Sequence, residues 1–177
     1  IVMPDADQDL TLKAITDSAY GCAGERCLAG AVVLAVGESH AWLRDGLKKR
    51  AESIQIGDGA QAGVTMGPVI SAEQQERVLG FVERAVAAKA TVVTGGGSVG
   101  DRGFFVSPTI VTDVAQDAEI VQNEVFGPVV TMQRFASDDE AIAMANGVRY
   151  GLAASVFSEN VGRAMKVAAK LDFGTVW

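Results

Sequence analysis

The chain has 177 residues, of which 49% are hydrophobic, and it carries a formal net charge of −7 with an isoelectric point near 4.7. This length and composition suit one globular α/β domain with a substantial core. The acidic balance argues against nucleic acid or an anionic membrane surface as a partner, because both select a basic face. No apolar run reaches the about 18 residues that a membrane span needs, so we expect a soluble protein.

In chain order, the first predicted helix covers Leu10–Ala23, and the acidic cluster Asp5–Asp7 before it can cap its free amides. Its predicted inward positions are Leu10, Ala14, Ile15 and Ala19, and Cys22 is expected to be packed filler. The continuous apolar run Ala31–Val36 predicts a strand buried on both faces. A helix from about Ala41 to Ser53 follows, and residues 54–69 are predicted to be irregular.

The next helix is opened by a capping box at Ser71–Gln74 and extends to about Lys89. After the strand Thr91–Thr94, Gly95–Gly97 has neither the spacing of a dinucleotide fingerprint nor a following Lys-Ser/Thr, so a flexible turn is favoured over a phosphate loop. The remaining predicted elements are strands Phe105–Val111 and Val129–Phe135, a helix capped at Ser137 and reaching about Asn146, strand Ala153–Phe157, helix Val161–Leu171 and strand Thr175–Trp177.

Strands and helices alternate along the chain, and no long hairpin signal intervenes. This pattern predicts an α/β fold with a mostly parallel sheet and helices on both faces.

Two cysteines, Cys22 and Cys27, and one histidine, His40, limit the chemistry. Five residues apart on a helix, the two thiols would point about 140° away from each other, so they are not predicted to pair. Reduced thiols are typical of a cytoplasmic protein. A single histidine, which we expect to be solvated, gives no zinc-ligand set and no Ser-His-Asp triad, so no metal site is predicted.

The segment Gly24-Glu25-Arg26-Cys27 places a cysteine next to a cation. Only the thiolate is strongly nucleophilic, and a neighbouring guanidinium favours that charged form. A small buried hydrophobe is the alternative interpretation, because free cysteine is among the most buried residue types.

Further segments follow Cys27 in a fixed order: Met66–Ile70, Gly103–Ile110, Asn123–Val129, Tyr150–Ser158 and Gly174–Trp177. In that order and at those spacings, the chain resembles the catalytic domain of the NAD(P)-dependent aldehyde dehydrogenase superfamily over nearly its whole length. The Glu-x-Phe-Gly-Pro element, about a hundred residues after the cysteine, is the specific part of the match.

The resemblance implies that residues 1–177 form the catalytic, thiol-bearing domain and that the cofactor-binding domain is absent from this chain. It implies that Cys27 attacks an aldehyde, passes a hydride to NAD or NADP and becomes thioacylated. Glu124 would accept hydrogen bonds from the nicotinamide-ribose hydroxyls, and Phe126 would border the nicotinamide ring. The alternatives are a solvated carboxylate for Glu124 and an ordinary core ring for Phe126.

Arg26 bears on the substrate class. Val2–Asp7 and Cys22–Gly30 are most similar to the methylmalonate-semialdehyde dehydrogenase branch, which passes its acyl group to coenzyme A and whose substrates carry a carboxylate that an arginine can bind. Alternatively, Arg26 only favours the thiolate. Glu25 stands where much of the superfamily has glutamine, and Asp172–Trp177 is more like the general aldehyde dehydrogenases.

Three functions therefore stand side by side: an acylating, NAD-dependent semialdehyde dehydrogenase, a hydrolytic aldehyde dehydrogenase of another substrate class, and a catalytically silent structural fragment. The chain by itself is expected to lack turnover, because the family's dinucleotide turn, oxyanion asparagine and general-base glutamate lie before it would begin. We expect the full-length enzyme to be a cytoplasmic homo-oligomer that acts on a small-molecule aldehyde, without nucleic acid or membrane partners.

Overall fold

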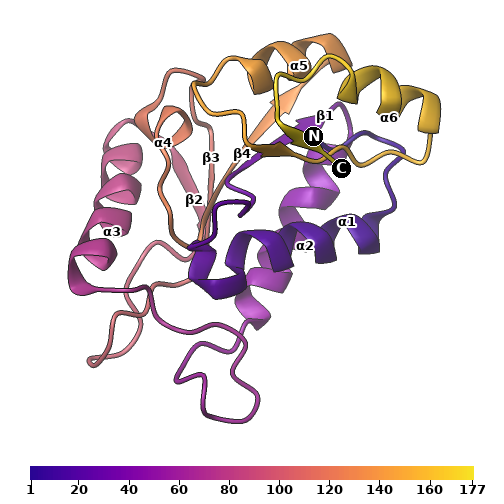
Figure 1. The fold of residues 1–177 in the computed structure, drawn as a ribbon. Coiled ribbons are helices and arrows are strands. Elements are labelled where there is room, and N and C mark those ends of the chain that lie inside the picture. The colour runs from indigo at the N-terminus through magenta and orange to yellow at the C-terminus, as the bar shows by residue number, and fades with distance from the viewer.

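A central four-stranded sheet organises the chain in the computed structural model, which describes residues 1–177 (Figure 1). Its strands are β1 (Val32–Val36), β2 (Thr91–Thr94), β3 (Thr109–Thr112) and β4 (Val129–Phe135). The strand order is β1-β4-β3-β2, with β1 and β3 parallel to β4 and β2 antiparallel beside β3. The predicted mostly parallel sheet is confirmed, with one antiparallel edge strand.

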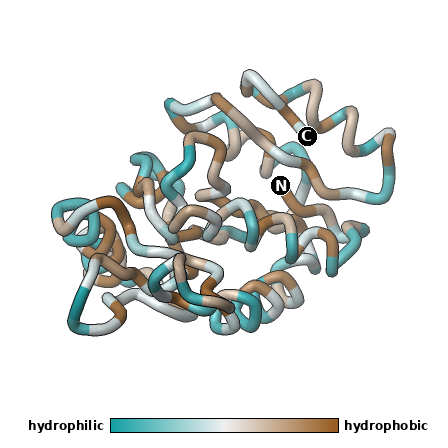
Figure 2. The backbone as a smooth tube through the Cα atoms, turned by 60° about the horizontal axis from the view of Figure 1, so that its bottom comes forward, coloured by the Kyte–Doolittle hydropathy of each residue, from teal (hydrophilic) through white to brown (hydrophobic).

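Six α-helices and one 3₁₀ turn connect the strands. They are α1 (Gln8–Tyr20), η1 (Gly21–Gly24), α2 (Ser39–Ser53), α3 (Ala72–Ala87), α4 (Glu119–Gln122), α5 (Asp138–Asn146) and α6 (Val161–Ala168). The predicted caps at Ser71 and Ser137 both form, since each hydroxyl accepts a backbone N–H three residues later at 3.2 Å. Figure 2 shows hydrophobic and hydrophilic residues alternating along the helices, as expected of helices that turn one face to a core.

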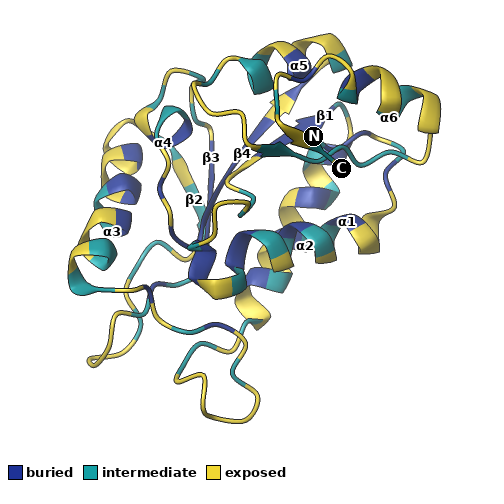
Figure 3. Cartoon of the chain, viewed as in Figure 1, coloured by how far each residue is buried: buried dark blue, intermediate teal, exposed yellow.

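Each face of the sheet has its own core, because successive residues of a strand point to opposite faces. Val33 and Ala35 of β1 belong to a cluster of 26 buried residues to which α1, α2, α3 and α4 contribute. Leu34 and Val36 belong to a second cluster of eight, with residues of α5 and α6. Helices therefore cover both faces, as predicted, and the strands between them are the most buried part of the chain (Figure 3).

A second, two-stranded parallel sheet is joined to the first by the start of the chain. It consists of β5 (Ala153–Ala154) and β6 (Thr175–Val176). Val2 forms parallel bridges both to Ala35 of β1 and to Phe157 beyond β5. The amide of Val2 donates to the carbonyl of Leu34 at 2.8 Å, and that of Phe157 donates to the carbonyl of Ile1 at 3.0 Å. Residues 1–3 thus form the seam between the two sheets.

The first helix differs from its prediction at its C-terminal end. It stops at Tyr20 rather than Ala23, because Cys22 and Ala23 adopt left-handed φ angles of 52° and 53°. Cys22 is exposed, so its prediction as packed helix filler is wrong. The cysteines consequently do not share a helix, and the argument from helical geometry does not apply to them.

The predicted inward face of the first helix is confirmed at Ile15 and Ala19 and wrong at Leu10. Leu10 is 64% exposed, and the buried positions are Thr11, Ile15, Ala19 and Tyr20. The side chain of Asp7 accepts from the amide of Leu10 at 2.8 Å, so the predicted acidic cap forms. The buried row then repeats every four residues from Thr11.

Several other elements are shorter than predicted. β3 begins only at Thr109, because the preceding Pro108 has no N–H to donate to a ladder. α3 ends at Ala87, and α6 ends at Ala168. The single-turn helix α4 was not predicted, since four residues are too few to show a helical period.

The glycine turn after β2 uses its backbone within the fold. The amide of Gly96 donates to Thr109 Oγ1 at 2.9 Å, and the carbonyl of Gly97 accepts from the amide of Ser107 at 2.9 Å. A Cβ on Gly95, where φ is +75°, would lie 2.2 Å from the carbonyl oxygen of Pro108. These contacts pin the turn to the start of β3 and agree with the prediction of a turn rather than a phosphate loop.

None of the helices combines the length and apolar character needed to cross a membrane. No group of three or more His, Cys, Asp and Glu side chains is placed to hold a metal ion.

Candidate active site

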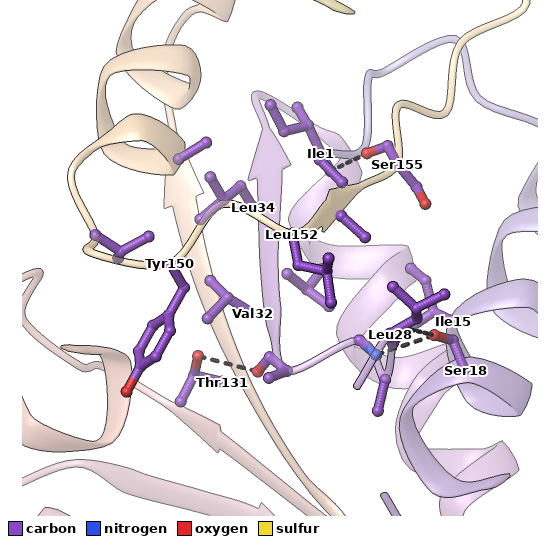
Figure 4. Close-up of a pocket in the computed structure, with 18 of the residues that line it drawn as sticks. Ile1, Ile15, Ser18, Leu28, Val32, Leu34, Thr131, Tyr150, Leu152 and Ser155 are labelled. Atoms are coloured by element: carbon purple, nitrogen blue, oxygen red, sulfur yellow. Dashed lines mark hydrogen bonds between the residues drawn. The ribbon is translucent and has the colours of Figure 1, made fainter. Parts of the chain in front are cut away.

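Cys27, Glu124 and Phe126 line one groove of about 640 Å³. Most of its lining is hydrophobic and comes from α1, the start of β1 and the segment around β5. Figure 4 shows Leu28 and Leu152 among the side chains of its walls. Residues about a hundred positions apart in the sequence are therefore brought to one surface.

Strand pairing explains why these segments meet. The segment with Cys27 leads into β1, and the segment with Phe126 leads into β4, which is the parallel neighbour of β1. The amide of Thr131 donates to the carbonyl of Ala31 at 2.9 Å, so the pairing extends to the entrance of β1. The two segments consequently emerge side by side at the amino edge of these strands.

Cys27 lies in a turn rather than in a helix or strand, and its thiol is free and exposed. Its backbone amide donates to no acceptor within the chain. The next turn is fixed, because the amide of Gly30 donates to Ser18 Oγ at 2.9 Å (Figure 4). The exposure contradicts the alternative of a small buried hydrophobe, and the unengaged amide is available to an oxyanion formed at the thiol.

Arg26 reaches back to the end of α1. Its Nη2 donates to the carbonyl of Asp17 at 2.8 Å and to that of Ser18 at 3.1 Å. A Cβ on Gly21 would lie 2.6 Å from the same nitrogen, so the guanidinium packs against backbone. The carbonyl of Asp17 also accepts from the amide of Gly21, so Arg26 adds a second donor there and provides one for Ser18, among the last carbonyls of the helix. Its predicted contact with a substrate carboxylate stays a prediction.

The cysteine segment touches two other parts of the site. Glu25 Oε1 accepts from the amide of Ile70 at 3.2 Å, next to the start of α3. A Cβ on Gly24, where φ is +71°, would lie 2.1 Å from the carbonyl oxygen of Gly127. A Cβ on Gly127 would in turn lie 2.5 Å from Val78 Cγ2 of α3. The three segments therefore meet where only glycine leaves room.

Glu124 and Phe126 are both exposed, and the buried Val125 lies between them. Phe126 has a φ of 54°, a left-handed conformation that costs a residue with a side chain about 1–2 kcal/mol. Such strain persists only where the surroundings over-determine it, and it clusters at functional sites. The exposure contradicts the alternative of an ordinary core ring for Phe126.

Four side chains that the sequence analysis did not single out surround this segment. Arg77 and Gln74 of α3 donate to its backbone carbonyls. On the other side, the Tyr150 hydroxyl accepts from the amide of Glu124 at 3.2 Å and from Arg149 Nη2 at 3.1 Å. These two hydrogen bonds lower the pKa of Tyr150, that of the Glu124 amide having the larger effect.

A family model described as the aldehyde dehydrogenase family matches residues 1–177. The chain belongs to the aldehyde dehydrogenase family. The resemblance in the sequence is thereby confirmed at the level of the family. The chain is 39% identical over 177 residues to a mitochondrial aldehyde dehydrogenase from Leishmania tarentolae. The alignment covers 100% of this chain and 36% of that protein.

This aldehyde dehydrogenase chain is also 39% identical over 181 residues to a betaine aldehyde dehydrogenase from Bacillus subtilis, covering 100% of this chain and 37% of that protein. Among solved structures, a betaine aldehyde dehydrogenase from Staphylococcus aureus in complex with NAD+ matches with a TM-score of 0.96 and 38% identity, covering 99% of this chain and 36% of that one. The chain thus spans just over a third of the length of these relatives. They support the family and not the methylmalonate-semialdehyde branch.

Proposed function

We propose that residues 1–177 are the catalytic portion of an NAD(P)-dependent aldehyde dehydrogenase in which Cys27 is the nucleophile. The observation that carries this proposal is that an exposed free thiol, an exposed carboxylate and an exposed aromatic ring share one groove. We propose Glu124 as the acceptor for the nicotinamide-ribose hydroxyls and Phe126 as the ring beside the nicotinamide.

The residues present fit the nicotinamide half of the cofactor. A carboxylate offers two acceptor oxygens to two neighbouring hydroxyl donors, which suits Glu124. The exposed ring of Phe126 offers a flat apolar surface. When bound, the oxidised nicotinamide accepts the hydride that leaves the substrate.

Catalysis begins when the thiolate of Cys27 attacks the aldehyde carbon. A carbon–sulfur bond forms, and the carbonyl electron pair moves onto oxygen to give a thiohemiacetal oxyanion. The amide of Cys27, which has no acceptor within the chain, is positioned to donate to that oxyanion. Most of the groove's lining is hydrophobic, and an apolar environment strengthens this hydrogen bond.

The oxyanion then re-forms the carbonyl as hydride leaves the carbon, and Cys27 is left as a thioester. An acceptor attacks the thioester carbon, the carbon–sulfur bond breaks, and the thiolate of Cys27 is regenerated. Sulfur suits both halves of this cycle, because a thiolate adds readily and leaves readily.

The acceptor distinguishes two finer functions. Coenzyme A, with a methylmalonate-type semialdehyde as substrate, is supported by the similarity of Val2–Asp7 and Cys22–Gly30 to that branch. Water, with an aldehyde of another class, is supported by the relatives named betaine aldehyde dehydrogenase. Arg26 weighs toward the second, because two of its hydrogen bonds already go to the end of α1.

The test is NADH production by the full-length protein with methylmalonate semialdehyde, propanal and betaine aldehyde, each with and without coenzyme A. Cys27→Ser is expected to lower turnover by about a thousandfold or more, and Cys22→Ser is the matched control at the other exposed thiol. Turnover that survives Cys27→Ser would refute the nucleophile. Turnover independent of coenzyme A would select the hydrolytic function.

A further inference from the structure

We infer that Arg77 is a positioning residue that fixes Glu124 and Phe126 in the groove, an inference that rests on the proposed function. Arg77 lies on α3. It is not among the residues that line the groove, nor among those that line the smaller hollow beside Cys27. It acts through the backbone of the segment that carries the two cofactor-facing side chains.

The contacts come from one face of α3. Arg77 Nη2 donates to the carbonyl of Glu124 at 2.6 Å, and Nη1 donates to that of Val125. Gln74 Nε2, one turn earlier, donates to the carbonyl of Phe126 at 2.5 Å and to that of Val125 at 3.3 Å. Three successive carbonyls are therefore bound by two side chains.

The segment depends on these donors. No backbone amide of the chain donates to the carbonyls of Glu124, Val125 or Phe126. The strained φ of Phe126 has to be stabilised from outside the residue. Gln74 occupies the position of a capping box from which its side chain would reach back to the amide of Ser71, and it points to the segment instead.

The shape of the guanidinium suits this task. Its two terminal nitrogens form a rigid fork that can bind two neighbouring carbonyls at once, which a lysine ammonium cannot reproduce with the same geometry. The guanidinium carbon of Arg77 lies 4.9 Å from the centroid of the Phe81 ring. This stacking limits the rotamers of Arg77, so the fork is held before the segment meets a cofactor.

The segment of residues 124–127 is held at its two ends by different contacts. At its C-terminal end, Gly127 is confined between Gly24 and Val78, so that end stays with the cysteine segment whatever Arg77 does. Without the fork, the Glu124 carbonyl has no donor and the stretch is held only by Gln74 and Tyr150, so it gains mobility while Cys27 keeps its place. The carboxylate and the ring would then hold the nicotinamide poorly over the thiohemiacetal, and hydride transfer depends on that alignment.

The structure supplies a matched control on the same helix. Arg84 stacks on the same ring, 5.0 Å from its centroid, but its guanidinium binds Glu119 at 2.7 and 3.2 Å instead of the segment. Arg84→Met therefore removes an equivalent charge and an equivalent stacking contact. Arg77→Met and Arg77→Lys are compared with it in the full-length protein, with an aldehyde and its C1-deuterated form.

We expect Arg77→Met to lower the hydride-transfer rate by about tenfold to a hundredfold, as for the loss of charged hydrogen bonds, and to raise the deuterium isotope effect on turnover. Arg77→Lys should lie between Arg77→Met and the unmodified protein. The iodoacetamide reactivity of Cys27 should be unchanged in all variants. Hydrogen exchange should rise at the amides of residues 124–127 only in the variants of Arg77.

Three outcomes separate the possibilities. Absence of NADH production by the unmodified full-length protein overturns the proposed function and not the contacts. Equal rates and equal isotope effects in Arg77→Met and Arg84→Met, in an active protein, overturn the positioning role. A loss of thermal stability in Arg77→Met without a change in the isotope effect shows a purely structural role and also overturns it.

Discussion

Replacing Gly24 by alanine tests whether the cysteine segment and the cofactor segment form one unit. The added Cβ would lie 2.1 Å from the carbonyl oxygen and 2.4 Å from the carbonyl carbon of Gly127. Neither backbone can yield cheaply, so overpacking costs about 1–3 kcal/mol, and alanine at a φ of +71° adds about 1–2 kcal/mol. The sum of about 2–5 kcal/mol corresponds to a fall in melting temperature of about 4–20 °C for a chain of this size.

The assay is thermal unfolding of the 177-residue chain, followed by circular dichroism, with Gly63→Ala as the matched control. Gly63 also has a positive φ, +86°, but a Cβ there would meet nothing within 4 Å. It should lose only the backbone contribution of about 1–2 kcal/mol, or about 2–8 °C. Equal losses in the two variants would refute the reasoning, because the contact with Gly127 would then contribute nothing.

Three further predictions concern the chemistry. Cys27 should react with iodoacetamide faster than Cys22 at neutral pH, since both thiols are exposed but only Cys27 lines the groove; peptide mass spectrometry measures the rates, and equal rates would argue against the nucleophile. Glu124→Gln in the full-length protein should slow hydride transfer more than it weakens NAD binding, because the carboxylate is proposed to bind only the nicotinamide ribose; stopped-flow and titration calorimetry measure the two, and a loss of affinity at full rate would contradict the assignment. The 177-residue chain should fold, as circular dichroism would show, yet produce NADH at least about a hundredfold more slowly than the full-length protein; comparable specific activity would mean that the cofactor site has been misplaced.

Two strands of the sheet were predicted with their observed bounds, because the residue pattern that defines each strand is local in the sequence. The strands Thr91–Thr94 and Val129–Phe135 have the predicted bounds, since each is a run of β-branched and apolar residues with clear ends. The end of α1 is marked by Gly21, a usual stop signal directly after Tyr20, but the prediction carried the helix past it to Ala23. Cys22 and Ala23 have left-handed backbone beside Gly24, which packs against Gly127 more than a hundred positions away, a long-range contact that a local pattern does not reveal.

In the site, too, features with a local sequence pattern were predicted and features that depend on long-range contacts were not. Cys27, Glu124 and Phe126 were predicted from motifs, and the structure places them in one groove, although their roles stay predictions. Arg77 could not be found in that way, because the sequence alone predicts an arginine on a helix to be a solvated charge. Its role depends on the contact with residues 124–125, which only the folded structure shows. A single sequence signal existed, the polar residue at the third position of the capping box, but it predicts a local contact rather than the long-range one that forms.

The seam made by residues 1–3 has a consequence for biosynthesis. Val2 pairs with Phe157, so the two sheets cannot be joined until the chain has emerged that far. At about 5–20 residues per second, a ribosome needs roughly 10–30 s to make that stretch. During this interval Val2 can pair with Ala35 of β1, but its pairing with Phe157 has to wait, and contacts of such long range slow folding. The pairing between the two sheets is therefore among the last contacts to form during synthesis, and until then one edge of Val2 stays unpaired.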